Sequence, residues 1–138
     1  MLKIMGIINL TPDSFWASSR VSAPDALPRM SGMAADGADI IDLGAVSTRP
    51  GAADVGVEEE WSRLEPVLRS LAFDSVRSEY GLQATEFSID TTSAEIVRRA
   101  YDLIGSFIVN DISAGEDDPA MLSTVSELKL SYIAMHKR

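Results

Sequence analysis

The sequence predicts one parallel α/β domain over residues 1–138, because short apolar runs alternate with longer amphipathic segments. The runs carry little polar alternation, which is typical of strands buried on both faces of a parallel sheet. The runs are 3–10, 39–43, 86–89, 106–109 and 131–135. Four helical patterns lie between them, and such alternation favours right-handed crossovers. From the pattern alone, an open doubly wound sheet and a barrel both remain.

The first helical pattern has signals at both ends and a proline within. Ser22 is the expected cap, with Asp25 three residues later, and Gly37 fits the end. Pro28 is expected to kink or delay the helix. The apolar face is expected to comprise Leu27, Met30, Met33 and Ala34.

The second helix is expected to start near Val57, with Glu58, Glu59 and Glu60 in the first turn, where the helix dipole favours acids. Pro66 is expected to interrupt it. Its apolar stripe is predicted to be Trp61, Leu64, Leu68 and Leu71.

The third and fourth helices are predicted from residues 93 to 103 and after Pro119, a residue suited to a first turn. The inward residues of the fourth are predicted to be Met121, Leu122, Val125 and Leu128.

Composition excludes several classes of function. The formal net charge of −9 argues against a nucleic-acid or anionic-membrane surface, since such partners need clustered Lys and Arg. The chain has no cysteine, which excludes disulfides and thiolate metal sites. No apolar run approaches the roughly 20 residues that a membrane span needs. We therefore expect a cytoplasmic protein.

Polar side chains close all five apolar runs. They are Asn9, Asp42, Asp90, Asn110 with Asp111, and His136. In parallel β/α folds the carboxyl ends of the strands share the face that carries the site. Any one of these residues could equally well mark only the point where a strand leaves the core or a turn begins. Polar residues at the ends of all five strands favour a shared site at the mouth of the fold. A carboxylate at Asp90 would accept two hydrogen bonds from an amino-pyrimidine edge.

Five segments of the sequence resemble the signatures of dihydropteroate synthases, in order and over residues 4–138. They are Met5-Gly6-Ile7-Ile8-Asn9-Leu10-Thr11-Pro12-Asp13-Ser14-Phe15, Gly37-Ala38-Asp39-Ile40-Ile41-Asp42-Leu43-Gly44 with Ser47-Thr48-Arg49-Pro50-Gly51, Ser88-Ile89-Asp90-Thr91, Ile108-Val109-Asn110-Asp111-Ile112-Ser113, and Met135-His136. The resemblance implies a TIM barrel. It also implies that 4-aminobenzoate is joined to 6-hydroxymethyl-7,8-dihydropterin diphosphate in folate synthesis, with sulfonamides as mimics of the aminobenzoate.

The resemblance also implies roles for individual residues. The pterin would be held by Asp90, Asn110, Ile112 and Met135. The loops that bind aminobenzoate and diphosphate would contribute Thr11, Pro12, Phe15, Ser47, Thr48, Arg49 and Pro50. Asn9 would bind Mg²⁺, and Asp13 or Asp90 would stabilise positive charge on the pterin methylene.

The family barrel has eight strands, and this sequence supplies five with four helices. We therefore expect a partial barrel that ends early, lacks normal activity alone, and forms a homodimer or pairs its open edges with another copy. A pterin-binding methyltransferase domain and a non-catalytic half-barrel are the alternatives. The Thr-Pro-Asp-Ser-Phe and Ser-Thr-Arg-Pro-Gly loops argue against the methyltransferase.

Overall fold

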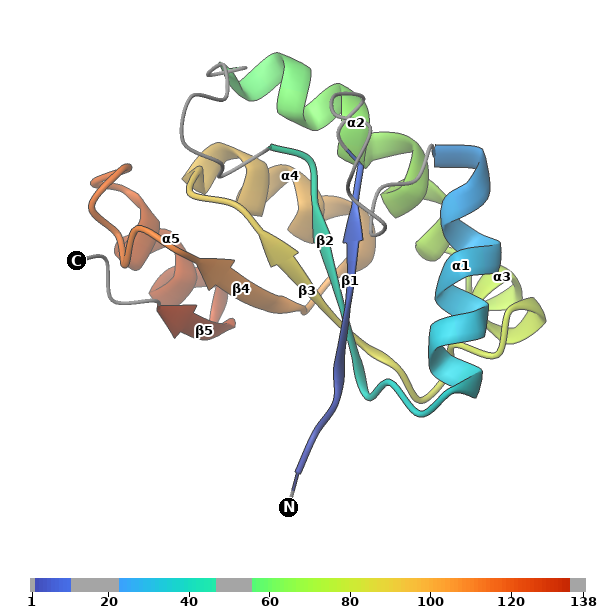
Figure 1. The fold of residues 1–138 in the computed structure, drawn as a ribbon. Helices are drawn as coiled ribbons and strands as arrows, with labels where there is room; N and C mark the ends of the chain where they lie inside the picture. Colours follow the sequence, from blue (N-terminus) through green and yellow to red (C-terminus); the bar gives the residue numbers. More distant parts are fainter. Residues whose placement is uncertain (1, 11–22, 47–55, 135–138) are drawn as a thin grey trace.

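The structure, a computed structural model, describes residues 2–10, 23–46 and 56–134 (Figure 1). Its strands are β1 (Met5–Asn9), β2 (Ile40–Gly44), β3 (Glu86–Asp90), β4 (Ile108–Asp111) and β5 (Ser131–Ala134). Its helices are α1 (Ala23–Ala35), α2 (Gly56–Leu71), α3 (Asp74–Glu79), α4 (Ala94–Ile104) and α5 (Met121–Leu128). The predicted alternation of strands and helices is thus confirmed.

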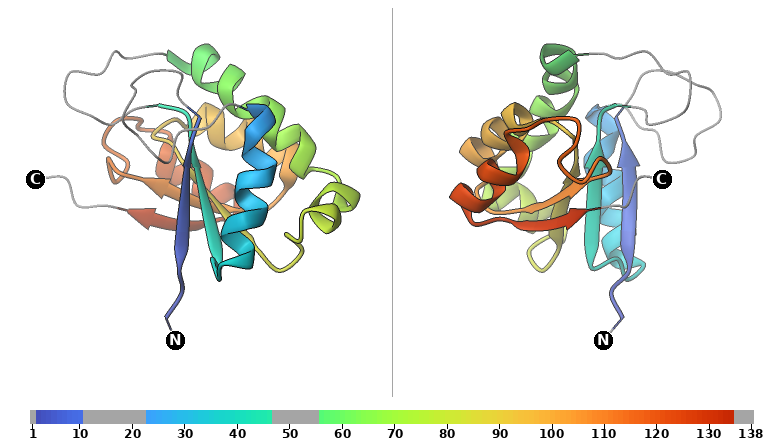
Figure 2. Two further views of the ribbon diagram at one scale, coloured as in Figure 1. Left: turned by 45° about the vertical axis from the view of Figure 1, so that its right-hand side comes forward. Right: turned by 90° about the vertical axis from the view of Figure 1, so that its left-hand side faces the viewer.

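The five strands form one parallel sheet in the order β1-β2-β3-β4-β5, so each strand pairs with the next strand in the chain. In a doubly wound sheet, the strand order reverses at a switch point, where a new strand is added on the other side of the first strand. The order found here has no such point. It is the order of a partial (β/α)8 barrel, as the resemblance implied. Helices lie along the outside of the curved sheet and pack on one another in the order α1, α2, α4 and α5 (Figure 2).

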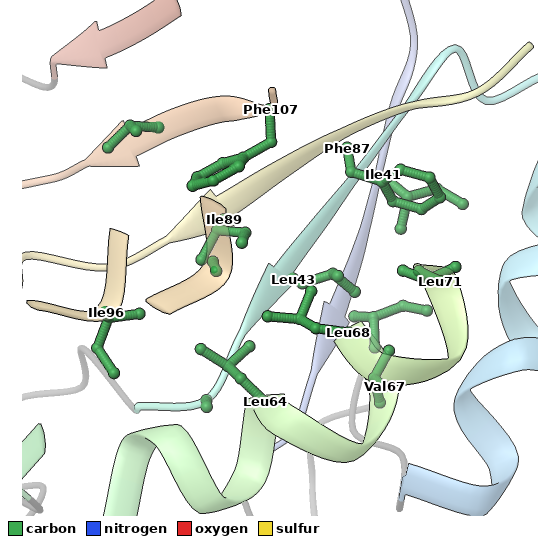
Figure 3. Close-up of a cluster of buried hydrophobic side chains, with 14 of the residues drawn as sticks. Ile41, Leu43, Leu64, Val67, Leu68, Leu71, Phe87, Ile89, Ile96 and Phe107 are labelled. Carbon is green, nitrogen blue, oxygen red and sulfur yellow. The ribbon is translucent and has the colours of Figure 1, made fainter. Parts of the chain in front are cut away.

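The hydrophobic core lies between the outer face of the sheet and the helices. Ile8, Leu43, Ile89 and Val109 occupy one register row of this face, and all four are fully buried. The α2 helix covers this part of the sheet with Leu64, Val67, Leu68 and Leu71 (Figure 3). These residues recur every three or four positions, which is the spacing that places them on one side of a helix.

The predicted delay of the first helix by Pro28 and the predicted interruption of the second helix by Pro66 were wrong, whereas the predicted kink at Pro28 stays a prediction. Helix α1 begins at Ala23, five residues before Pro28, so this proline does not delay it. Helix α2 continues through Pro66 without interruption. A proline inside a helix removes one hydrogen bond and costs about 3 kcal/mol. Buried side chains on both sides of each proline, such as Leu64 and Val67 around Pro66, offset that cost.

The signals at helix ends were more reliable. Gly37 follows α1 with a backbone φ of 106°, which residues with a Cβ rarely adopt. Ser93 caps α4, because its Oγ accepts a hydrogen bond from the Ile96 N–H at 3.3 Å. The predicted cap of α1, Ser22, lies outside the described residues.

Two helical details also differ from the sequence prediction. Leu122 was expected to point inward, but it is 55% exposed and lies against Gly115, while Thr124 is buried instead. Leu122 is one residue from Met121, so it lies about 100° around the helix from the buried face. Helix α3 was not predicted, because its six residues include no buried side chain and leave no apolar periodicity.

Candidate active site at the carboxyl ends of the strands

The register of the sheet aligns the predicted polar residues on the inner face. One row across the five strands contains Asn9, Gly44, Asp90, Asn110 and Ile133, and we call it the site row. Residues paired in register point to the same face of a sheet. Asn110 was predicted to end the fourth strand together with Asp111, and these two residues are the last of β4. The structure therefore brings three predicted site residues, Asn9, Asp90 and Asn110, to one edge of the inner face.

Gly44 makes room in the site row. A Cβ at this position would lie 3.4 Å from the Asp90 Cβ and 3.7 Å from Asp90 Oδ2. The lack of a side chain at Gly44 therefore leaves open the space beside the Asp90 carboxylate. A flat ligand that reaches Asp90 would use this space.

Asp42 lies one level below the site row, paired in register with Ser88. It is 3% exposed, and its Oδ1 accepts hydrogen bonds from Ser88 Oγ and, at 3.4 Å, from Asn110 Nδ2. Burial raises the pKa of Asp42, and the bonds from Ser88 and Asn110 oppose this shift. From the sequence, Asp42 was predicted only as the polar residue that closes the second strand. The structure shows a buried carboxylate that supports Asn110 from below.

Asn110 has one unsatisfied atom. Its Oδ1 is covered from solvent and accepts no hydrogen bond from the described residues, although its Nδ2 donates to Asp42. A buried acceptor without a partner costs about 1–3 kcal/mol. A ligand N–H that reached this oxygen would remove that cost.

Asp90 is the strongest electrostatic feature of the site. Burial raises its pKa from an ordinary 3.8 to about 7, and the nearby carboxylates of Asp42, Glu60 and Asp111 add to the shift. The acid form of Asp90 therefore persists to a much higher pH than that of an ordinary aspartate. Titratable groups whose pKa is shifted this far by burial and by neighbouring charges are typical of functional sites.

Sequence reasoning missed the role of Glu60. It was expected only as an acidic residue in the first turn of α2, where the helix dipole favours a negative charge. The structure shows that it is buried and accepts a 2.7 Å hydrogen bond from Thr91 Oγ1. Thr91 directly follows Asp90, so this bond ties the end of β3 to α2. The signal was present in the sequence, because Glu60 is four residues before Leu64 and eight before Leu68, in line with the buried stripe.

Asp111 organises the loop that contains Ile112, a predicted pterin contact. The Asp111 carboxylate is fully buried and accepts hydrogen bonds from the N–H groups of Ser113 and Gly115, both at 2.9 Å. It also accepts bonds from the hydroxyls of Ser113 and Tyr132. Burial and the bond to Asp111 raise the pKa of Tyr132 to about 12, so its hydroxyl stays a donor. Asp111 thus supports the loop rather than facing a ligand.

The remaining predicted site residues lie outside the described residues. They are Thr11, Pro12, Asp13, Phe15, Ser47, Thr48, Arg49, Pro50 and Met135, together with His136. Their roles stay predictions. Among the residues that are described, no three His, Cys, Asp or Glu side chains are grouped so as to hold a metal ion. The described helices include none that is long and apolar enough to cross a membrane.

A hollow of about 270 Å³ opens at the other end of the sheet, between residues such as Arg77, Phe87, Phe107 and Ser131. The Arg77 guanidinium lies 5.5 Å from the Phe87 ring centroid, and its Nε donates to the Leu71 carbonyl at 2.7 Å. This cation is thus committed to packing and a helix end. The predicted polar side chains converge instead at the carboxyl ends of the strands, the edge at which parallel β/α folds place their sites.

Three known proteins are similar to this chain over nearly its whole length. A mitochondrial folate synthesis bifunctional protein of Arabidopsis thaliana is 43% identical over 136 residues, which cover 98% of this chain and 24% of the relative. The dihydropteroate synthase of Xanthomonas albilineans, solved with 4-aminobenzoic acid, has 35% identity and a TM-score of 0.78, with 97% of this chain and 46% of that chain covered.

The Yersinia pestis dihydropteroate synthase, solved with a sulfonamide drug, has 34% identity and a TM-score of 0.81, with 99% of this chain and 46% of that chain covered. This chain therefore spans less than half the length of each of the three proteins. The family model described as pterin binding enzyme matches residues 5–138. Because that match includes every strand, helix and polar residue described above, the chain belongs to the family of pterin binding enzymes.

Proposed function

We propose that this chain is the pterin-binding part of a dihydropteroate synthase. The reaction would join 4-aminobenzoate to 6-hydroxymethyl-7,8-dihydropterin diphosphate, giving 7,8-dihydropteroate and diphosphate. Membership of the pterin-binding family and the similarity to two dihydropteroate synthases support the proposal. The Xanthomonas albilineans structure with 4-aminobenzoic acid supports the choice of the second substrate.

The observation that carries the proposal is the pairing of Asp90 with Asn110 in the site row. A pterin has an edge with adjacent N–H donors, which a carboxylate can accept as a pair. The amide of Asn110 offers one acceptor oxygen that has no partner among the described residues. Gly44 leaves space beside Asp90 for a flat ring.

In the reaction, the amine nitrogen of 4-aminobenzoate attacks the pterin methylene carbon as the carbon–oxygen bond to diphosphate breaks. The diphosphate leaves with the electron pair of that bond, and the amine loses a proton to water or to the departing diphosphate. Asp90 in its ionised form stabilises the positive charge that develops on the pterin. Asp13 and the two loops that contain Phe15 and Arg49 would add charge and exclude water.

Mg²⁺ is part of the proposal. Asn9 ends β1 in the site row and offers a side-chain oxygen, the ligand type that Mg²⁺ prefers. The remaining ligands would be diphosphate oxygens and water. The ion would neutralise charge on the departing diphosphate.

A binding experiment tests the proposed function. We expect calorimetry to show binding of 6-hydroxymethyl-7,8-dihydropterin diphosphate that is tighter with Mg²⁺ than with EDTA, and that Asp90→Asn weakens at least tenfold, as for loss of a charged hydrogen bond. The matched control is Asp102→Asn, the same change at an exposed position on α4. No heat from the wild-type chain at millimolar ligand would refute the proposal.

We further propose that the chain alone does not turn over both substrates at a normal rate, since it spans under half of the similar synthases. A steady-state assay with both substrates tests this, and turnover near that of an intact synthase would contradict it.

A cytoplasmic location remains a prediction, which fractionation of cells that produce the protein would test.

Assembly is a related proposal. Strands β1 and β5 end the described sheet without a further partner strand, and Met5, Ile7 and Ile133 leave apolar area exposed on the inner face. Exposed edges and apolar patches favour association. We expect the isolated chain to form a dimer or a larger edge-paired assembly, which light scattering after size exclusion would detect. A monomer at all concentrations would contradict this.

A further inference from the structure

We propose that Asp42 is a positioning residue, which fixes the orientation of the Asn110 amide so that Asn110 Oδ1 is presented to an N–H donor of the bound heterocycle. This inference rests on the proposed function and deepens it, because it names what decides the hydrogen-bonding polarity of the pterin site. Asp42 acts through Asn110 and does not itself contact the ligand.

The burial of Asp42 supports an indirect role. Only 3% of the residue is exposed, and it lies one register level below the site row, between Ile7 on β1 and Ser88 on β3. A ligand that contacts Asp90 and Asn110 therefore lies above Asp42. A carboxylate is costly to bury without hydrogen-bond donors, and Ser88 and Asn110 supply two.

The chemistry of the contact determines which end of the amide faces Asp42. An ionised carboxylate only accepts hydrogen bonds, and so does the oxygen of an amide. If the Asn110 amide were rotated by 180°, two acceptor oxygens would face each other across the 3.4 Å contact that Nδ2 now makes. Asp42 thus selects the orientation with Nδ2 below and with Oδ1 accepting no hydrogen bond from the described part of the chain.

Ser88 strengthens this selection. Its hydroxyl donates to the same Oδ1 atom of Asp42 that accepts from Asn110, so the carboxylate oxygen is held in place between β3 and β4. The three residues lie on three adjacent strands, and Ser88 is fully buried. The orientation of the amide is therefore built into the sheet before any ligand arrives.

The consequence is selectivity for a ligand with a donor at this place. A heterocycle that presents N–H to Asn110 gives Oδ1 a hydrogen bond that no described residue supplies, whereas one that presents a bare ring nitrogen places two acceptors together. Sites built to hydrogen-bond one group reject analogues that lack it, because buried polar groups are then left unpaired.

The first test needs no ligand. In NMR spectra of the isotopically labelled chain, we expect Asp42→Asn to shift and broaden the side-chain amide signals of Asn110, because a neutral amide at position 42 permits both orientations. We expect Ser88→Ala to shift the same signals less, which provides a milder variant if Asp42→Asn fails to fold. Unchanged Asn110 side-chain signals in a folded variant of either kind would overturn the proposal.

The second test is a double-mutant cycle on the affinity for the pterin diphosphate. We expect Asp42→Asn to weaken binding about tenfold when Asn110 is present. The same change should have little effect in the Asn110→Ala background. An equal loss in both backgrounds would show a merely structural role and overturn the proposal.

Glu60→Gln is the matched control for charge, since Glu60 and Asp42 both raise the pKa of Asp90. Glu60 is on α2 and is bonded by Thr91, so we expect its effect on binding to be the same with and without Asn110. If the wild-type chain does not bind the pterin diphosphate, the proposed function fails. The NMR measurement then still decides whether Asp42 orients Asn110.

Discussion

The two faces of the same five strands differ in composition and in task. On the outer face, a register row of Ile8, Leu43, Ile89, Val109 and Tyr132 packs under the helices. One residue later in every strand comes the site row, Asn9, Gly44, Asp90, Asn110 and Ile133, on the inner face. The residues that drive folding and the residues proposed for binding are therefore direct chain neighbours. A register slip of one residue would exchange them.

The largest expected effect comes from two adjacent isoleucines on opposite faces. Ile8 is fully buried and Ile7 is 55% exposed. We expect Ile8→Ala to lower the free energy of unfolding by about 2–5 kcal/mol, as for other truncations in a packed core. Ile7→Ala is expected to change it by no more than about 0.5 kcal/mol. Urea unfolding of both variants measures the difference, and equal losses would show that the inner face is also packed.

Asp90 is expected to give the next largest effect, with the opposite sign. Because its pKa is raised from 3.8 to about 7, the folded chain keeps a proton that the unfolded chain has already released. This group therefore lowers the free energy of unfolding as pH rises above about 4 and through 7, and the loss is complete by about pH 8.

We expect Asp90→Asn to be more stable than the wild type at pH 8 by on the order of 1–3 kcal/mol, with the difference shrinking toward pH 4. Thermal or urea unfolding across this pH range measures it. A difference between variant and wild type that does not vary with pH would show that Asp90 has an ordinary pKa.

The helices that cover the outer face also depend on their ends. Ser93→Ala removes the oxygen that accepts from the Ile96 N–H, and we expect a loss of about 1 kcal/mol in the free energy of unfolding. Ser93→Asn is the matched control, since Asn caps a helix as well as Ser does. A control as unstable as the alanine variant would mean that another property of Ser93 matters.

Gly44→Ala is expected to have the smallest effect on stability. It is nevertheless expected to lower the affinity of the inner face for a pterin. The added Cβ would meet Asp90 at 3.4 Å, an ordinary contact, so we expect the free energy of unfolding to change by less than about 1 kcal/mol. The same methyl would occupy the space beside Asp90, and we expect pterin affinity to fall about tenfold. Unchanged affinity would place the ligand elsewhere.

The outer face was largely predictable from the sequence, because burial leaves a periodic pattern. The strand runs were found within one or two residues, and the end of α1 at Gly37 and the cap of α4 at Ser93 followed from known preferences. The errors had physical causes. Packing around Pro66 overrides the cost of a proline, and Leu122 lies outside the narrow buried side of an eight-residue helix.

The inner face was predictable only in part. Polar residues at strand ends identified Asp90 and Asn110 as candidates, since each strand contributes its last residues to one edge. The hydrogen bonds that connect Asp42 with Ser88 and Asn110 join residues 46 and 68 positions apart in the chain. Local patterns contain no record of such contacts. The same is true of the bond between Thr91 and Glu60, which depends on how α2 lies over β3.

The order of the sheet has a consequence for how this protein is made. Each of the strands β2 to β5 pairs with the strand that precedes it in the chain. On a ribosome, each of the strands β2 to β5 therefore emerges when its preceding partner has already been synthesised. The sheet can lengthen in the direction of translation, one strand and helix at a time. Both members of the register pair Asp90 and Asn110 would be available as soon as β4 has left the exit tunnel.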